Sequence, residues 1–300
     1  MVGHLNGNAK MWGSLGLSHS SNNTTQCTIP EQRPSNTNLK MPKPKKSATT
    51  TNGKPAQTST PSAPPPSSAA PPSWPPFKPS LPITDLTFDS LVDDKVVVLR
   101  NFFPKSLCRD YVSFLSTLPL ITTPGKPKRG MAVRVNDRFQ IDDQKFADRL
   151  WYETGLKEAV VGGGLEHLWG GEVIGLNPNI RIYRYTKGQF FDAHYDDSNK
   201  ITLTLPSSDD NPNQKQVPAK TTWTLLLYLT SASEGCTGGE TVFYPHDRQV
   251  AREAIAVAPE TGMLLLHKHG NDCMLHEGRE VTAGEKWIIR TDLCVGRGER

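Results

Sequence analysis

Residues 181–198, RIYRYTKGQFFDAHYDDS, decide the fold prediction, because they begin as an alternating strand and end in a His-x-Asp pair. In extended backbone, residues two apart point to the same side, so His194 and Asp196 can bind one metal ion together. Such tripeptides also arise by chance. The hypothesis of a metal site therefore depends on a third ligand from elsewhere in the chain.

The third ligand has to come from one of four later histidines: His246, His267, His269 and His276. His246 lies in a turn-like setting after a strand and is expected at the surface. His267 and His269 end the apolar run GMLLLHKH, and one of them could face the interior. His276 opens HEGREVTAGEKWIIR, where a glycine turn and a basic residue that begins a new strand follow in order, so we choose it over His267. Two histidines and one carboxylate leave positions open on the ion, which is typical of non-haem iron(II) oxygenases.

The segments after residue 180 are short and strand-like, and turns rather than helices separate them. This arrangement indicates a sandwich or barrel rather than alternating α/β units. We therefore predict a mainly β protein with supporting α-helices and a double-stranded β-helix, or jelly-roll, core. The expected strands are residues 180–185, 221–230, 240–244, 254–259, 262–267 and 286–295.

Order is expected to begin near Leu81. Residues 95–100 (KVVVLR) predict a β-branched strand, and Pro104 opens a helix with apolar residues at helical spacing. A second helix starts at Asp142 or Asp143, either of which can cap it. We expect one oxygenase-type domain over residues 81–300, with helical support over about 81–170 and the jelly-roll core over about 171–300.

Residues 1–80 contain 14 of the 25 prolines, among Ser, Thr, Asn and Ala. Residues 61–79 (PSAPPPSSAAPPSWPPFKP) indicate an extended, polyproline-like chain that cannot bury a core, so we predict a disordered, Pro/Ser/Thr-rich basic tail. The formal charge of residues 1–80 is +7 and that of the whole chain is +4, so residues 81–300 carry about −3. This mildly acidic part gives no electrostatic reason to expect a nucleic-acid partner, whereas the tail could bind ligands of proline-rich segments.

Three features bear on the compartment. The basic cluster Lys43, Lys45 and Lys46 fits a nuclear-import signal or, more often for such clusters, a solvated charge run. Five scattered cysteines without a Cys-x-x-Cys pair fit a reducing compartment better than a disulfide framework. No apolar run approaches the roughly 20 residues that cross a bilayer, and the first 20 residues lack the apolar core of a signal peptide. We expect a cytoplasmic or nuclear protein with no membrane partner.

Four ordered segments follow one pattern. Tyr-x-x-Gly-x-x-aromatic-x-x-His-x-Asp is followed by a strand ending in Tyr-Leu, a Gly-Gly-x-Thr-x-Phe turn, and a His with a Lys ten residues on. The matching residues are Tyr185, Gly188, Phe191, His194, Asp196, Tyr228, Leu229, Gly238, Gly239, Thr241, Phe243, His276, Val281, Gly284 and Lys286. This set resembles the 2-oxoglutarate and Fe(II)-dependent dioxygenases of the prolyl 4-hydroxylase type over roughly residues 180–293. The long polar loop 205–220 departs from the pattern, and the region before residue 180 is much less diagnostic.

The resemblance implies an oxidoreductase that binds iron through His194, Asp196 and His276 and uses 2-oxoglutarate and O2. It would hydroxylate a C–H bond of a protein side chain, a prolyl residue among the candidates, or of a small molecule, with release of succinate and CO2. The alternative is a metal-binding pseudoenzyme or an interaction protein that retains the jelly-roll. The intact triad and the retained Lys286 argue against that alternative.

In such enzymes the far carboxylate of 2-oxoglutarate needs a cation. Lys286 aligns with the basic residue of the family through the ten-residue step from His276. Arg290 lies four residues further on the same strand face, and its planar fork suits a carboxylate, so both residues stay open as candidates. By family analogy Tyr185 would hydrogen-bond the same carboxylate, and Thr224 on the central strand would help.

The sequence does not identify the prime substrate. Arg134, Asn136 and Arg138 alternate along an expected strand and could hold an anionic or amide-bearing substrate at the pocket mouth, although a solvent-exposed strand has the same pattern. Three residues around the iron motif could also line the entrance: Tyr195, Asp197 and Arg184.

Overall fold

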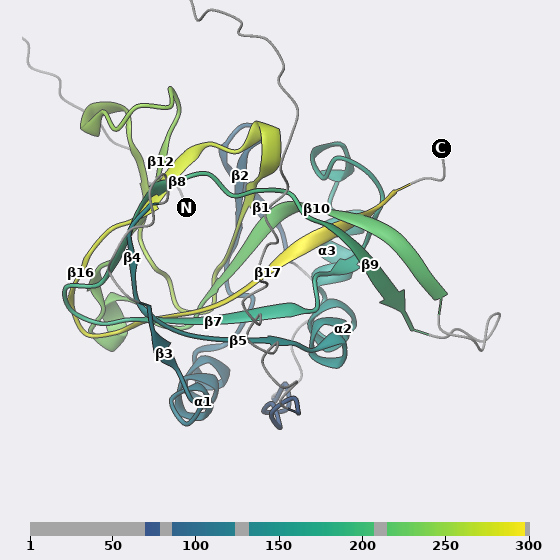
Figure 1. Ribbon diagram of the computed structural model, residues 1–300, viewed down its shortest axis with the longest axis horizontal. Helices are drawn as coiled ribbons and strands as arrows, with labels where there is room; N and C mark the ends of the chain where they lie inside the picture. The colour runs from purple at the N-terminus through teal and green to yellow at the C-terminus, as the bar shows by residue number, and fades with distance from the viewer. Residues whose placement is uncertain (1–69, 79–85, 124–131, 207–214, 298–300) are drawn as a thin grey trace, which may run out of the picture. The chain divides into compact units, whose positions relative to one another are not determined.

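The computed structural model describes residues 70–78, 86–123, 132–206 and 215–297 (Figure 1). The chain divides into two units, Met1–Ala63 and Pro64–Arg300, and the first lies wholly outside the described residues. The predicted disorder of residues 1–69 and the basic cluster Lys43–Lys46 therefore lie outside the described residues too.

Two antiparallel β-sheets dominate the described part of the second unit. The strands of the larger sheet are β1 (Phe88–Val92), β2 (Val96–Leu99), β3 (Ile121–Thr122), β5 (Asp137–Asp142), β6 (Val173–Leu176), β7 (Asn179–Tyr185), β9 (Lys200–Leu205), β10 (Lys215–Tyr228), β14 (Leu264–Lys268) and β17 (Lys286–Gly296). The smaller sheet contains β4 (Arg134–Val135), β8 (Phe190–His194), β12 (Thr241–Tyr244), β13 (Ile255–Val257) and β15 (Leu275–Gly278). A short separate pair consists of β11 (Thr237–Gly238) and β16 (Val281–Ala283).

The strand order explains how distant segments meet. The larger sheet runs β1-β2-β14-β10-β17-β7-β5-β3, with β6 paired to β17 and β9 paired to β10. The smaller sheet runs β13-β12-β15-β8-β4. The central strands are thus joined to partners far away in the chain, as in a jelly-roll.

Alternate residues of the central strands enter two different cores. On β7, Ile182 packs in the core under the helices, whereas Tyr183 lies in the core between the two sheets. On β10, Leu225 and Leu226 divide in the same way. A strand buried on both faces needs apolar residues at consecutive positions, which explains runs such as VVVL and LLL. The mainly β, jelly-roll fold predicted from the sequence is confirmed.

Three α-helices in the described residues cover the outer face of the larger sheet (Figure 1): α1 (Lys105–Leu115), α2 (Gln144–Tyr152) and α3 (Leu156–Gly162). Asp143 caps α2, because its side chain accepts a hydrogen bond from the Phe146 amide at 3.0 Å. Both predicted helices are therefore present. Four 3-10 turns lie at Glu166–Leu168, Ala232–Glu234, Ala251–Glu253 and Gly270–Asp272.

The structure departs from the predicted division into helical support (81–170) and core (171–300). The first part supplies β1, β2, β3 and β5 to the larger sheet and β4 to the smaller one. The local pattern of residues 95–100 predicted β2, but its pairing with β14 and that of β5 with β7 join distant segments, so their place in the sheet was not predicted. Part of the expected polar loop 205–220 is also strand, since β10 begins at Lys215 and pairs with β9.

Residues 70–78, which composition assigned to the unpacked tail, contact the helices. Trp74 stacks on Phe146 with 3.9 Å between the ring centroids, and its Nε1 donates to Asp143 Oδ2 at 2.7 Å. The Pro75 carbonyl accepts a hydrogen bond from the Tyr111 hydroxyl at 2.9 Å. The predicted inability to pack is therefore wrong for this segment.

The aromatic side chains of Phe77 and Trp74 explain why the prediction for residues 70–78 was wrong. The Phe77 ring lies 5.5 Å from that of Phe103, and the Arg149 guanidinium lies 4.6 Å above it. The prediction weighed the prolines and overlooked two aromatic side chains, which bury large areas each. The proline-rich backbone between them is extended at low entropic cost, so both rings reach the helices.

Two further findings concern membrane-spanning helices and the cysteines. No helix in the described part of the chain is long and apolar enough to cross a membrane. Cys108, Cys236, Cys273 and Cys294 are buried free thiols, and Cys27 lies outside the described residues.

Candidate metal centre

The register of the smaller sheet brings the predicted metal ligands together. His194 is the last residue of β8, and it pairs directly with His276 of β15 across the antiparallel ladder. Asp196 follows two residues later, while Tyr195 between them is 50% exposed. The ligand atoms of His194, Asp196 and His276 all lie within 4.8 Å of one another. This geometry allows one ion to contact all three side chains.

Backbone carbonyls orient both imidazoles. His194 Nδ1 lies 2.8 Å from the Asp192 carbonyl oxygen, and His276 Nδ1 lies 2.9 Å from that of Met274. A carbonyl oxygen only accepts, so each Nδ1 carries the proton and each Nε2 keeps a free lone pair. Metal-binding histidines are typically held in this way.

Asp196 is held through one of its two oxygens. Oδ2 accepts hydrogen bonds from the Thr224 hydroxyl and from the Arg290 guanidinium, both at 2.8 Å. Oδ1 lies 3.8 Å from His194 Nε2 and accepts no hydrogen bond from the described residues. The carboxylate is therefore fixed on one side and open on the other.

The protonation states suit metal binding at neutral pH. Burial, followed by the neighbouring His276, lowers the pKa of His194 to about 3. Burial also lowers the pKa of His276. Burial alone would raise the pKa of Asp196, but Arg290 and the surrounding histidines hold it well below its usual range. Two neutral imidazoles and one ionised carboxylate fit an Fe(II) ion.

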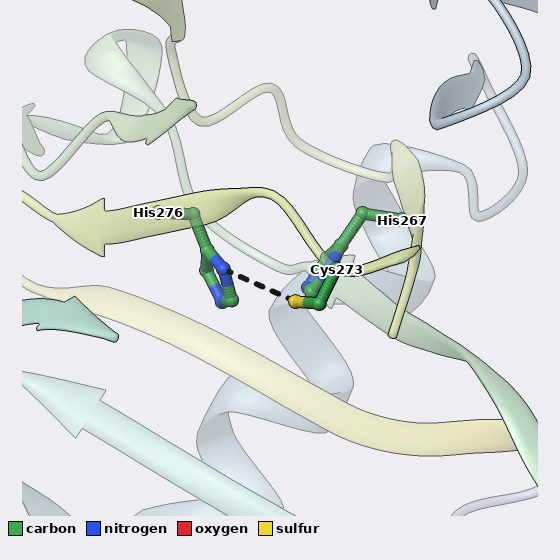
Figure 2. A group of neighbouring side chains, drawn as sticks. All are labelled: His267, Cys273 and His276. Atoms are coloured by element: carbon green, nitrogen blue, oxygen red, sulfur yellow. Dashed lines mark hydrogen bonds between the residues drawn. The ribbon is translucent and has the colours of Figure 1, made fainter. Parts of the chain in front are cut away.

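A second set of donors shares His276 with the first. His267 of β14, Cys273 and His276 also have ligand atoms within 4.8 Å of one another. Figure 2 shows the Cys273 sulfur directed toward the His276 ring, and its distance to His276 Nδ1 is 3.9 Å. Burial raises the pKa of the Cys273 thiol to about 11, so the sulfur keeps its proton and is a poor ligand. The nearby Nδ1 is also engaged by the Met274 carbonyl, so the contacts favour the set with Asp196.

Both donor sets contain His276, whereas His267 belongs only to the second. His267 Nε2 lies 3.6 Å from Asp196 Oδ2, the oxygen already bound by Thr224 and Arg290. These contacts favour His276 as the distal ligand, as the sequence predicted. His269, also buried, contacts Thr224 and Thr221 instead. His246 is exposed.

Lys286 is a buried cation without a carboxylate partner in the described residues. Its Nζ donates to the Gly239 carbonyl at 2.5 Å and lies 5.5 Å from the ring centroids of both Tyr185 and Tyr228. Gly239 has a φ of +71°, and a Cβ there would lie 3.1 Å from Lys286 Cδ. The second glycine of the Gly-Gly turn thus leaves room for the lysine side chain.

Arg290, the rival of Lys286, is already paired. Its guanidinium donates to Asp196 Oδ2 at 2.8 Å and lies 3.8 Å from Asp292 Oδ1. Thr224 likewise donates to Asp196. Arg290 and Thr224 therefore contact the proposed metal ligand, whereas Lys286 has no carboxylate partner among the described residues.

A cavity of about 1400 Å³ opens beside the triad, and His194, Asp196 and Arg290 line it. Of the residues proposed for the entrance, Arg134, Arg138, Tyr195 and Asp197 also line this cavity. Asn136 does not: it is fully buried, and it contacts Thr123 because it lies at the break between β4 and β5. Arg184 pairs with Asp137 outside the cavity lining.

The sequence reading missed Arg181 and Asp292. Asp292 is buried, accepts from the Arg181 guanidinium at 2.5 Å and from Asn177 at 2.9 Å, and lies beside Arg290. An ionic chain therefore runs from Arg181 through Asp292 and Arg290 to Asp196. The alternating charges of Arg290 and Asp292 within a buried strand were the available signal, because buried charges require partners.

A model of the 2OG-Fe(II) oxygenase superfamily matches residues 180–291. Comparison with curated proteins found no match. Similar solved structures include the viral collagen prolyl hydroxylase vCPH from Paramecium Bursaria Chlorella virus-1, with 18% identity over 67% of this chain and 96% of that chain and a TM-score of 0.41. A Pseudomonas putida prolyl-4-hydroxylase has 16% identity over 68% and 94% of the two chains, with a TM-score of 0.43. HygX from Streptomyces hygroscopicus, with nickel and 2-oxoglutarate bound, has 14% identity over 67% and 83%, with a TM-score of 0.42.

A jelly-roll that gathers two histidines and a carboxylate on one side of an ion defines the class of non-haem iron oxygenases. The family match includes the three predicted ligands together with Lys286 and Arg290. Residues 180–291 are a 2OG-Fe(II) oxygenase domain, and the protein is a dioxygenase that uses Fe(II), 2-oxoglutarate and O2.

Proposed function

We propose that this dioxygenase hydroxylates a C–H bond of a prime substrate while 2-oxoglutarate is converted to succinate and CO2. One oxygen atom of O2 enters the hydroxyl group and the other enters succinate, so the reaction balances. The observation that carries the proposal is the combination of the His194, Asp196 and His276 donors with Lys286, a buried ammonium without a carboxylate partner in the described residues.

His194, Asp196 and His276 would hold the iron, which supplies the site for O2 reduction when bound. The chain's own residues do the positioning. Arg290 and Thr224 fix Asp196 Oδ2, which leaves Oδ1 for the ion. Two histidines and one carboxylate would leave positions on a bound iron open to co-substrate and oxygen.

Lys286 would bind the far carboxylate of 2-oxoglutarate, with Tyr185 beside it. The aromatic rings of Tyr185 and Tyr228 keep water from the ammonium, which strengthens a charge pair formed there. Lys286 also pairs with Tyr185 in the register of β17 and β7, so the two side chains share one environment. Arg290 remains the alternative partner.

Lys286→Ala is expected to raise the apparent 2-oxoglutarate requirement more than tenfold, because breaking a buried charge pair costs roughly 2–5 kcal/mol. Arg290→Ala should instead weaken iron binding, because Asp196 loses one of its two hydrogen bonds. The measurements are apparent 2-oxoglutarate affinity at saturating iron and iron affinity, with Lys187→Ala as an exposed control. A 2-oxoglutarate effect confined to Arg290→Ala would exchange the two roles.

The affinity for 2-oxoglutarate is expected to fall as the pH rises above about 8. Burial lowers the pKa of Lys286 to about 8, so the free site loses its ammonium above that pH. A bound carboxylate stabilises the charged form and raises this pKa, so binding takes up a proton at higher pH. Titration calorimetry in two buffers of different ionisation enthalpy measures the uptake one pH unit above that pKa. Uptake that persists in Lys286→Ala would assign the proton to another group.

Anaerobic titration of the Fe(II)-loaded protein with 2-oxoglutarate tests the proposed function. A visible charge-transfer band, followed by succinate formation on exposure to air, is the expected result. Iron binding without the band or succinate would favour the pseudoenzyme alternative. His276→Ala is the matched control, because it removes a ligand and should lose the band.

The prime substrate is proposed to be a protein side chain, a prolyl residue among the candidates, rather than a small molecule. The cavity of about 1400 Å³ supports an extended substrate, since pockets for small molecules are typically about 300–1,000 Å³. The proposed compartment remains the cytoplasm or the nucleus.

A further inference from the structure

We infer that the prime substrate is an acidic peptide whose carboxylate binds Arg134 and Arg138 next to the metal centre. The inference rests on the proposed hydroxylase function and adds the substrate class. Both arginines line the cavity that His194 and Asp196 also line.

Arg134 and Arg138 share one aromatic platform. Their Cζ atoms lie 5.6 Å and 6.0 Å from the centroid of the Tyr183 ring. Arg134 Cζ also lies 4.9 Å from the Phe191 ring, which stacks on His194 at 3.6 Å. Arg134 therefore contacts His194 through one intervening side chain, Phe191. A group bound by Arg134 would lie close enough to the proposed metal site to position a neighbouring C–H bond.

In the described residues, no acidic side chain compensates the positive charges of Arg134 and Arg138. Among the described residues, neither arginine has a carboxylate within ion-pair distance, and Arg138 donates to the neutral Gln140 side chain. Two more arginines, Arg181 and Arg290, lie nearby, but Asp292 and Asp196 neutralise them.

The arginines near the Tyr183 ring repel one another. Burial lowers the pKa of Arg138, and Arg134, Arg181 and Arg290 lower it further. Burial opposes ionisation of Tyr183, yet the same arginines lower its pKa overall. A bound anion would relieve this repulsion, and the planar fork of arginine suits a carboxylate.

Three observations favour an acidic peptide over other anions. Asp142 and Asp197 line the same cavity, so a polyanion such as a nucleic acid, which carries a charge at every phosphate, would be repelled there. Residues 81–300 also carry a net charge of about −3. The cavity exceeds the roughly 300–1,000 Å³ of small-molecule pockets, which favours a peptide over a free dicarboxylic acid.

The test uses the full-length Fe(II) protein and two synthetic proline-containing peptide pools, identical except that Asp and Glu in one are Asn and Gln in the other. Peptide-dependent succinate formation and the mass increase of the peptides are measured, with N-acetylaspartate as a third arm. The acidic pool is expected to give a rate about tenfold higher, the effect of one charge pair.

Arg134→Gln/Arg138→Gln should remove the preference between the pools, whereas Arg134→Lys/Arg138→Lys should keep most of it. Arg248→Gln/Arg252→Gln, at exposed sites outside the cavity lining, is the matched control and should keep the preference. Melting temperatures check that each variant is folded.

If the proposed function is wrong, the wild type forms no succinate from 2-oxoglutarate under any condition, and this result is distinguishable from a failure of the inference alone. With succinate formed, equal response to both pools, or to neither, overturns the inference. A response to N-acetylaspartate alone overturns the peptide as the source of the carboxylate. A preference that survives in Arg134→Gln/Arg138→Gln overturns the assignment to these residues.

Discussion

His276→Ala is expected to abolish iron-dependent 2-oxoglutarate turnover while the fold is retained. Changes in groups that merely support a ligand cost about 10–100-fold in metal affinity, so loss of the ligand itself should exceed about 100-fold. His194→Ala and Asp196→Ala should behave alike, because the three donors lie within 4.8 Å of one another. Iron affinity, succinate formation and circular dichroism are the measurements.

His267→Ala distinguishes the two overlapping donor sets. If Asp196 belongs to the site, this variant should still bind one equivalent of iron, although removal of a buried ring lowers its stability. His246→Ala, at an exposed position, serves as the neutral control. Full activity of His276→Ala combined with loss of iron in His267→Ala would overturn the choice of distal ligand.

Removal of residues 1–78 is expected to lower the melting temperature, whereas removal of residues 1–69 should not. The difference isolates the segment whose Trp74 stacks on Phe146 and bonds to Asp143. Trp74→Ala alone should cost about 2 kcal/mol, less than the roughly 3–5 kcal/mol of a fully buried tryptophan, because Trp74 is partly exposed. For a domain of this size that corresponds to roughly 4–8 °C.

Trp12→Ala provides the matched control for this prediction. Trp12 lies in the low-hydrophobicity part of the chain that composition predicts to be disordered, so its loss should leave the melting temperature unchanged. Equal melting temperatures for the two truncations would show that the packing of residues 70–78 contributes nothing to stability. Thermal unfolding followed by circular dichroism measures all four proteins.

The sequence by itself determined the fold class and identified the residues proposed for the metal site. Strands that are buried on both faces contain consecutive apolar residues, as in VVVL and LLL. The strands of the β core could therefore be predicted from short stretches of sequence. The His-x-Asp pair follows from strand periodicity, since residues two apart share a side. The α2 cap was equally local, because Asp143 bonds to an amide three residues away.

Only the tertiary structure decided between residues that local spacing treats alike. Lys286 and Arg290 share a strand face. Arg290 pairs with Asp196, which follows β8, whereas Lys286 has no carboxylate partner in the described residues. His276 gained support over His267 because the register of β15 and β8 sets it opposite His194.

The packing of residues 70–78 was also beyond the sequence, because the aromatic surface that receives Trp74 is assembled from α1 and α2. Local composition records what a segment can bury but not whether a partner surface exists. Long-range strand pairing and helix packing supply those partners, and they arise only once the chain is folded.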